Sequence, residues 1–240
     1  MKENQPVDKK YKMTTEVEIL PKPEPKQFSI FLFFVGVYLP LQIFALLAIA
    51  ILQNGTGLSW DVSLLSAIHQ TETPQLDAFA AILTQFGYLK GILPIVLFVS
   101  LFLIFRQQWY RLAYLLTVEF GAILISYSVK LVYHRARPHL WELFQPLPLD
   151  YSFPSGHSLM SMILFVALLH LSWETHWRKW VMIIGGFFVV GIAWTRMYLG
   201  VHFPSDVLGG WMLAIAWGVG VNLIFQSPFV KLITRKQEIP

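Results

Sequence analysis

Three short stretches of the sequence carry side chains that could bind and attack a phosphate group. The first, KLVYHRARP, holds three cations, of which Lys130 and Arg137 could share one helical face. They are seven residues apart, about two helical turns, so they lie about 10 Å apart on one face if the helix continues to Arg137. They would then flank one pocket. The alternative is that both side chains simply reach from a helix end to water or lipid phosphate.

The second stretch, Pro154-Ser155-Gly156-His157, opens a long apolar segment. Ser155 suits a helix N-cap, Gly156 lets the backbone approach a ligand, and His157 falls in the first helical turn. Free N–H groups and the helix dipole favour an anion at such an end. An ordinary cap would explain Ser155 but not His157.

The third stretch, TRMYLGVHFPSD, ends one apolar segment and begins the next. His202 and Asp206 are four residues apart, so the carboxylate can hold one imidazole nitrogen and leave the other as a nucleophile. Arg196 adds a guanidinium for phosphate oxygens, and Pro204 suits the first position of the following helix. The alternative is that Asp206 stabilises a helix N-terminus while His202 packs at the interface.

The segments that position these stretches belong in a membrane. Of the 240 residues, 55% are hydrophobic and 13% are charged, which is not typical of a soluble domain. A bilayer core about 30 Å thick needs about 20 apolar residues to cross it. The sequence predicts an all-α polytopic protein with six transmembrane helices, at residues 28–52, 88–105, 109–133, 155–173, 177–199 and 204–225.

The remaining segments are more polar. Apolar residues recur at helical spacing within 54–87, which predicts two short helices lying on the outer leaflet. Residues 1–27 are rich in lysine, glutamate and proline and are expected to form a disordered cytoplasmic tail. A single membrane domain, 28–228, is followed by a cytoplasmic tail, 229–240.

Basic residues in the short loops and tails predict the orientation. By the positive-inside rule, the face that carries most of them is cytoplasmic. This face would hold both termini and Arg106, Arg111, Arg178, Lys179, Lys231, Arg235 and Lys236. The three stretches would then face outward. Lys90, Arg135 and Arg137 also lie on the outer side, so the rule holds only if these three have another purpose.

Composition excludes several kinds of chemistry. The chain has no cysteine, which rules out disulfides and thiolate sites, and its acids do not cluster with histidines at metal-ligand spacing. We therefore expect chemistry without a metal or other cofactor. Basic residues are spread out rather than gathered in one patch, so the expected partners are the bilayer and a lipid phosphate, not nucleic acid. No required protein partner is inferred.

Together the three stretches resemble the signature of the type 2 phosphatidic acid phosphatase superfamily, also called lipid phosphate phosphatases. Its pattern is Lys, six residues, Arg-Pro; then Pro-Ser-Gly-His; then Ser-Arg, five residues, His, three residues, Asp. The matching residues here are Lys130, Arg137-Pro138, Pro154 to His157, Thr195-Arg196, His202 and Asp206. Threonine at position 195 in place of serine is the one departure, and it keeps the hydroxyl.

The resemblance implies a role for each matching residue. His202 would attack phosphorus to form a phosphohistidine, Asp206 would orient it, and His157 would protonate the leaving oxygen and later activate water. The implied phosphate cradle comprises Lys130, Arg137, Ser155, Gly156 and Arg196.

The implied activity is hydrolysis of a lipid phosphate or diphosphate by a bacterial six-helix enzyme of the cell membrane. Undecaprenyl pyrophosphate is the favoured substrate because the site is expected to face outward, and phosphatidylglycerophosphate is the next. A phosphotransferase of the same fold is an alternative, as is a non-catalytic lipid-binding protein. A transporter would place its ionisable residues near the bilayer midplane, where only Glu119 is expected.

Other polar residues are expected to have structural roles. Arg135 should either contact phosphate or form a loop salt bridge with Glu142 or Asp150. Glu119 should make a buried hydrogen bond, with a proton path as the alternative. The histidines outside the family pattern are assigned to interfaces or loops; they are His69, His134, His139, His170 and His176.

Overall fold

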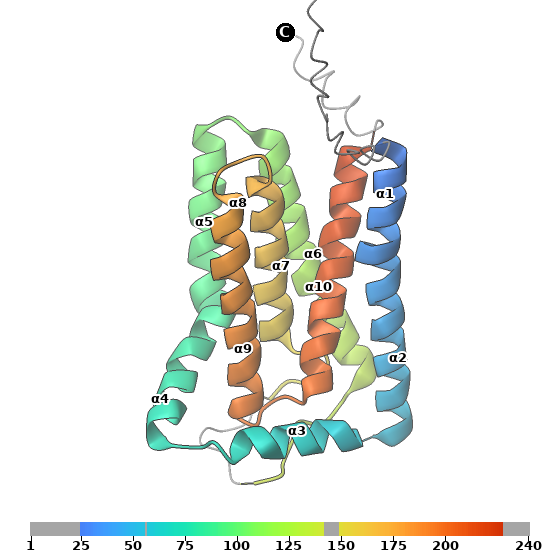
Figure 1. Ribbon diagram of the computed structural model, residues 1–240, viewed down its shortest axis with the longest axis vertical. Helices are drawn as coiled ribbons and strands as arrows, with labels where there is room; N and C mark the ends of the chain where they lie inside the picture. The colour runs from blue at the N-terminus through green and yellow to red at the C-terminus, as the bar shows by residue number, and fades with distance from the viewer. Residues whose placement is uncertain (1–24, 56, 142–148, 228–240) are drawn as a thin grey trace, which may run out of the picture.

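The computed structural model describes residues 25–55, 57–141 and 149–227, and all regular secondary structure in these ranges is helical (Figure 1). This confirms the all-α class. The α-helices are α1 (Pro25–Phe33), α2 (Leu39–Asn54), α3 (Ser59–His69), α4 (Pro74–Leu83), α5 (Leu89–Phe105), α6 (Trp109–Tyr133), α7 (Gly156–Ser172), α8 (Arg178–Trp180), α9 (Gly186–Tyr198) and α10 (Pro204–Gln226). Short turns of π-helix, at Phe34–Tyr38 and Val181–Gly185, and of 3-10 helix, at Thr84–Gly87, connect some of them.

The helices confirm a multi-pass membrane protein but not the count of six spans. Within the described ranges, four continuous helical stretches are long and apolar enough to cross a bilayer: Ser29–Asn54, Trp109–Tyr133, Arg178–Tyr198 and Pro204–Gln226. The pair Pro74–Gly87 and Leu89–Phe105, bent by 40°, would make a fifth. The remaining predicted span, α7, forms as expected but has only 17 residues, fewer than a span usually needs.

The long helices run side by side, and α3 crosses their lower end in Figure 1. The start of α1 and the end of α10 lie at the upper end. The start of α7, the start of α10 and the end of α9 lie at the lower end, near α3. The two short helices predicted within 54–87 are therefore present as α3 and α4; their place on the outer leaflet stays a prediction.

The boundaries of the predicted tails can be compared only in part. Helix α1 begins at Pro25, so the last three residues of the predicted tail 1–27 are helical. The other residues of that tail, the tail 229–240 and Glu142 lie outside the described residues.

Helix α7 is central and packs against α6, α9 and α10. Its buried face includes Leu159, Ile163 and Ala167. Helix α10 comes very close to the start of α7 because Gly210 has no side chain. A Cβ added at Gly210 would lie 2.8 Å from the carbonyl oxygen of Ser155. Small residues at crossing points allow such close approach between membrane helices. The close approach brings the beginnings of α7 and α10 together.

We predict that Gly210→Ala destabilises the protein. The added methyl group must push α10 away from α7, and overpacking of this kind costs about 1–3 kcal/mol. Gly186→Ala is the matched control, since a Cβ at this helical position would have no atom within 4 Å. Thermal unfolding in detergent should show a melting temperature several degrees lower for Gly210→Ala only. Equal melting temperatures for the two variants would contradict this account of the crossing.

Candidate functional site

The three stretches singled out in the sequence meet around one pocket of about 270 Å³ at the lower end of the bundle. The residues lining it are Tyr88, Lys130, Arg137, Asp150, Gly156, His157, Arg196 and His202. Six of these are predicted site residues. The other two predicted residues, Ser155 and Asp206, are fully buried and do not line the pocket.

Lys130 and Arg137 reach the pocket by different routes. Lys130 lies in the last turn of α6, which ends at Tyr133, and His134 adopts a left-handed conformation with φ 44° and ψ 30°. The helix therefore does not continue to Arg137, and the two cations do not share one helical face. Pro138 also disfavours a helical conformation at the residue before it. The non-helical segment still brings Arg137 to the pocket, where it donates to the carbonyl of Val201 at 2.7 Å.

The contacts of His202 define which nitrogen carries its proton. A guanidinium nitrogen of Arg137 lies 3.0 Å from His202 Nε2. Because a guanidinium only donates, Nε2 must accept and the proton belongs on Nδ1. Burial lowers the pKa of His202 well below its usual value, and the charges of Arg137, Arg196 and Lys130 lower it further. His202 is therefore a neutral imidazole at neutral pH.

Asp206 lies behind His202, on the side away from Arg137. Its Oδ2 is 3.5 Å from His202 Nδ1 and accepts from the backbone N–H of Phe203 at 2.8 Å. The Ser152 hydroxyl donates to the same oxygen at 2.5 Å and is 3.4 Å from His202 Nδ1. Ser152 is outside the sequence motifs, and nothing in its local sequence indicates this contact.

His157 enters the pocket from the first turn of α7. Its ring stacks on Tyr88, with ring centroids 5.0 Å apart and an interplanar angle of 24°. At the neighbouring Gly156, an added Cβ would make only ordinary contacts, at 3.7 Å from the Tyr88 ring and 3.8 Å from Ser126 Oγ. The packing around Gly156 therefore does not by itself require glycine.

Ser155 has the contacts of an ordinary helix cap. Its Oγ accepts from the backbone N–H of Ser158 at 3.4 Å and from the Ser158 hydroxyl at 3.1 Å. Its own backbone N–H donates to the carbonyl of Asp206 at 3.0 Å. These contacts tie α7 to α10, so a phosphate contact from Ser155 stays a prediction.

Arg196 lines the pocket from the last turn of α9. Its guanidinium donates to Thr84 Oγ1 at 2.9 Å, and its Nε is buried without a partner among the described residues. Thr84 lies in the 3-10 turn before α5, far from the motifs in sequence. Sequence reasoning therefore missed it.

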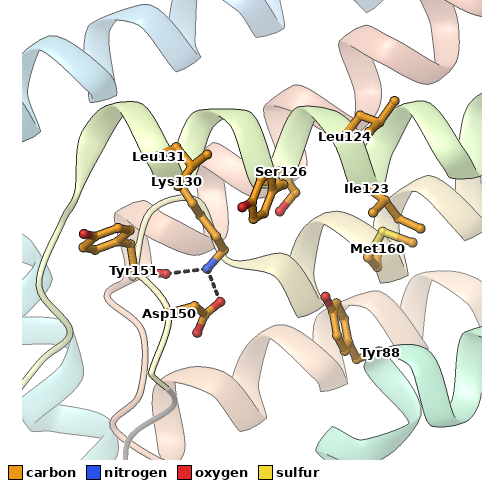
Figure 2. A pocket seen from close by; sticks show the side chains of 10 residues that line it. Tyr88, Ile123, Leu124, Ser126, Lys130, Leu131, Asp150, Tyr151 and Met160 are labelled. Atoms are coloured by element: carbon orange, nitrogen blue, oxygen red, sulfur yellow. Dashed lines mark hydrogen bonds and ion pairs between the residues drawn. The ribbon is translucent and has the colours of Figure 1, made fainter.

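A carboxylate, Asp150, joins the two cations on the other side of the pocket. Its oxygens lie 2.8 Å from Lys130 Nζ and 2.5 Å from an Arg137 guanidinium nitrogen. Lys130 also donates to the carbonyl of Tyr151 (Figure 2). Partial burial raises the pKa of Asp150, but the hydrogen bond and charge of Lys130, together with Arg137, outweigh it and lower the pKa to about 2. The carboxylate is therefore ionised at neutral pH.

A second pocket, of about 390 Å³, adjoins the first and shares Tyr88, Lys130 and Asp150 with it (Figure 2). Much of its wall is apolar and comes from α6, with Leu124 67% exposed and Tyr127 64% exposed. It therefore opens on the flank of the helix bundle rather than only at its end.

Arg135 does not make the contacts expected of it. Its guanidinium is fully buried and pairs with Asp61 at 2.9 Å and with Asp206 at 2.5 Å. It neither lines the pocket nor contacts Asp150, and Glu142 lies outside the described residues. The left-handed turn at His134 places Arg135 toward α3 and α10, whereas Arg137 reaches the pocket. Sequence reasoning also missed Asp61, which is on α3.

The remaining polar residues lie away from the pocket. Glu119 is 5% exposed, and neither of its carboxylate oxygens has a partner among the described residues, so the expected hydrogen bond is not found. The other histidines lie at helix ends, in loops or between helices, as predicted. His69 stacks on Trp141 at 3.9 Å between ring centroids, and His170 packs against Tyr114 at 4.5 Å.

Comparison with known proteins gives consistent matches. Residues 111–229, which include all three stretches, match the family described as the PAP2 superfamily. An undecaprenyl-diphosphatase of Sulfolobus acidocaldarius is 31% identical over 180 residues, which cover 72% of this chain and 83% of that protein. Phosphatidylglycerophosphatase B of Bacillus subtilis is 33% identical over 199 residues, which cover 79% of this chain and 90% of that protein.

Solved structures share the fold. A transmembrane PAP2-type phosphatidylglycerolphosphate phosphatase from Bacillus subtilis matches with a TM-score of 0.67 and 28% identity, over 78% of this chain and 95% of that one. Aquifex aeolicus LpxE matches with a TM-score of 0.57 and 24% identity, over 69% of this chain and 96% of that one. Sequence pattern, pocket and relatives agree, and we conclude that the chain belongs to the PAP2 superfamily.

Proposed function

We propose that this protein is a lipid phosphatase that hydrolyses a lipid phosphate or diphosphate through a phosphohistidine on His202. The observation that carries the proposal is the pocket in which a neutral imidazole, a second histidine and three cations converge. Phosphoryl transfer requires positioned positive charge for the phosphate oxygens, a nucleophile on one side and an acid on the other.

In the first step, the Nε2 lone pair of His202 attacks phosphorus while Lys130, Arg137 and Arg196 hold the phosphate oxygens. The N–P bond forms, and the bond from the attacked terminal phosphorus to its leaving oxygen breaks; this oxygen is the ester oxygen of a lipid monophosphate or the bridging oxygen of a lipid diphosphate. His157, protonated when the negatively charged phosphate binds, gives its proton to the leaving oxygen. The charge that develops on the His202 ring is balanced by Asp206 through Nδ1–H.

In the second step, His157 is neutral and takes a proton from water. The water oxygen bonds to phosphorus, the N–P bond breaks, and its electron pair returns to Nε2. Inorganic phosphate leaves, and His202 is again neutral. Arg137 bonds to Nε2 in this structure, so it must turn toward the phosphate before attack can occur.

The second pocket supports a lipid as the substrate. It leads from Lys130 to the exposed flank of α6, along Ile123, Leu124 and Leu131 (Figure 2). In a membrane this flank faces hydrocarbon, so an acyl or prenyl chain can lie there while its phosphate reaches the cations. The names of the relatives favour undecaprenyl diphosphate, with phosphatidylglycerophosphate as the next candidate.

The active site is proposed to face away from the cytoplasm. The start of α7, which lines the pocket, is at the end of the bundle opposite the start of α1 and the end of α10 (Figure 1). Both termini are proposed to be cytoplasmic under the positive-inside rule. The basic residues on the pocket side have other roles: Lys90 bonds to Gln85, Arg135 is buried with two carboxylates, and the pocket is lined by Lys130, Arg137 and Arg196.

His202→Ala should reduce phosphate release by at least about a thousandfold, because no other group in the pocket can replace Nε2 as nucleophile. Purified protein would be assayed in mixed micelles containing EDTA, with undecaprenyl diphosphate and phosphatidylglycerophosphate as substrates and free phosphate as product. His139→Ala, an exposed loop histidine, is the control and should keep wild-type rates. A His202→Ala variant that turns over near the wild-type rate would exclude the proposed nucleophile.

Asp150→Asn should bind inorganic phosphate roughly tenfold more tightly than the wild type, as measured by calorimetry. The Asp150 carboxylate pairs with Lys130 and Arg137 and so competes with phosphate for these two cations. The substitution removes the negative charge of the competing group. With a pKa of about 2, the carboxylate stays ionised between about pH 5 and pH 8, so the charge that the substitution removes is present throughout that range. Glu72→Gln removes a charge at the surface, near His69, and should leave binding unchanged. Weaker binding by Asp150→Asn would refute the competition.

The chain has no cysteine, so single introduced cysteines can report its orientation. Gln75→Cys, on the pocket side, should react with a membrane-impermeant maleimide in intact cells. Glu174→Cys, at the opposite end of the bundle, should react only after the cells are opened. Both positions are exposed. The reverse labelling pattern would place the active site in the cytoplasm.

A further inference from the structure

We infer that Asp61, on helix α3, is a positioning residue for the pair His202–Asp206 and that it acts through Arg135. The inference rests on the proposed function and extends it to a helix outside the matched region 111–229. It assigns a role to two residues, Asp61 and Arg135, that do not line the pocket.

The contacts of Asp61 are unusually complete for a side chain that is fully buried. Its Oδ1 accepts from the backbone N–H of Ser205 at 2.8 Å. Its Oδ2 accepts from the Ser205 hydroxyl at 2.6 Å, from Arg135 at 2.9 Å and from the backbone N–H of Leu58 at 3.2 Å. Asp61 therefore holds both Arg135 and the first turn of α10, the turn that carries Asp206.

Arg135 lies between two buried carboxylates. One terminal nitrogen contacts Asp61, and the other contacts Asp206 Oδ1 at 2.5 Å and Ser205 Oγ at 2.7 Å. The Phe203 ring covers the guanidinium, with its centroid 4.5 Å from Cζ. A buried guanidinium in this position needs anionic partners at both ends of its fork.

The arrangement determines the orientation of Asp206. Because Arg135 occupies Oδ1, the oxygen that faces His202 is Oδ2. Oδ2 is itself held by the backbone N–H of Phe203 and the Ser152 hydroxyl, so the carboxylate is fixed at both oxygens and the Nδ1 proton of His202 keeps a fixed acceptor. This acceptor in turn leaves Nε2 as the nitrogen with the free electron pair.

The arrangement also determines how much negative charge Asp206 offers. One guanidinium shared between two carboxylates leaves a net charge of about −1 in the network. Without the Asp61 charge, Arg135 would neutralise Asp206 alone. The positive charge that develops on His202 during attack would then be less stabilised, and the pKa of His202 would fall further.

Other charged groups also influence the protonation of His202, and a test of Asp61 must leave them unchanged. They are Lys130 on α6, Arg196 on α9, His157 on α7, Arg137 and Asp150 in the loops, and Asp206 itself. None of them except Asp206 contacts Asp61 or Arg135 among the interactions described. A change at Asp61 therefore reaches His202 through Arg135 and Asp206.

A purely structural role, in which Asp61 only fastens α3 to α10, makes different predictions. Asp77 provides the matched control because it is also a buried carboxylate on a short helix, α4. It accepts from the Tyr198 hydroxyl at 2.7 Å and so fastens α4 to α9, without a link to His202. Asp77→Asn should reproduce any effect that comes only from loosening a short helix.

The experiment compares wild type, Asp61→Asn and Asp77→Asn for kcat, KM and their pH dependence with one lipid phosphate. For Asp61→Asn we expect kcat to fall by at least roughly tenfold, KM to stay within about twofold, and the acid limb of the kcat profile to move to lower pH. The direction follows from the lost negative charge, which disfavours the protonated imidazole. Asp77→Asn should keep the wild-type acid limb.

Arg135→Lys is the second variant. Lysine keeps the positive charge but has one nitrogen, so it cannot bind Asp61 and Asp206 through two separate nitrogens. We therefore expect kcat to fall while the acid limb of the kcat profile stays in place. If Asp61→Asn does not fold, as judged by its thermal unfolding, Arg135→Lys carries the test. A folded Asp61→Asn with unchanged kcat and acid limb, an equal shift in Asp77→Asn, or an unchanged kcat in Arg135→Lys would overturn the inference.

A spectroscopic measurement separates this inference from the proposed function. The ¹⁵N shifts of the His202 ring, assigned with His202→Gln, report its tautomer without any substrate. Wild type and Asp77→Asn should carry the proton on Nδ1, and Asp61→Asn should show a mixture. If the wild type hydrolyses no lipid phosphate, the proposed function fails, and the tautomer still decides the role of Asp61. An identical tautomer in all three proteins would overturn that role.

Discussion

The structure of the site depends on one constraint: charged groups taken out of water must satisfy one another. Arg135, Asp61 and Asp206 are all fully buried, and each would be very costly without the others. Their pairing joins the segment after α6, the helix α3 and the first turn of α10. These three elements are far apart in sequence, and nothing else described brings all of them to one point. Asp206 can stay buried behind His202 because Arg135 and Asp61 complete this network.

The same constraint explains why the site lies at helix ends. Inside a bilayer, backbone groups must bond within their own helix, so irregular backbone is confined to the surface or to cavities. At the end of the bundle the chain can leave the helix, as it does at His134, and the first N–H groups of α7 are free of helical partners. Cationic side chains, an open helix end and a buried imidazole can therefore meet at the pocket, with the hydrocarbon only a short distance away.

The sequence predicts the helices and the motif residues well, because both depend on local patterns. Apolar runs locate α6 and α10 to within one residue, and motif spacing identifies six of the residues that line the pocket. The sequence does not predict partners that come from elsewhere in the chain, such as Asp61 and Thr84, because no local pattern marks a contact across 70 residues or more. Arg135 was misassigned for a related reason: a single left-handed residue, His134, decides which way it points.

The second pocket has a consequence for how such an enzyme would meet its substrate. Under the proposed function, an opening on the flank of α6 would take lipid from the surrounding leaflet rather than from the aqueous phase. Encounter is then a diffusion process in two dimensions, and the relevant concentration is the mole fraction of substrate among neighbouring lipids. Adding inert lipid would slow the reaction even when the total amount of substrate and protein stays the same. The composition of the membrane thereby becomes part of the kinetics.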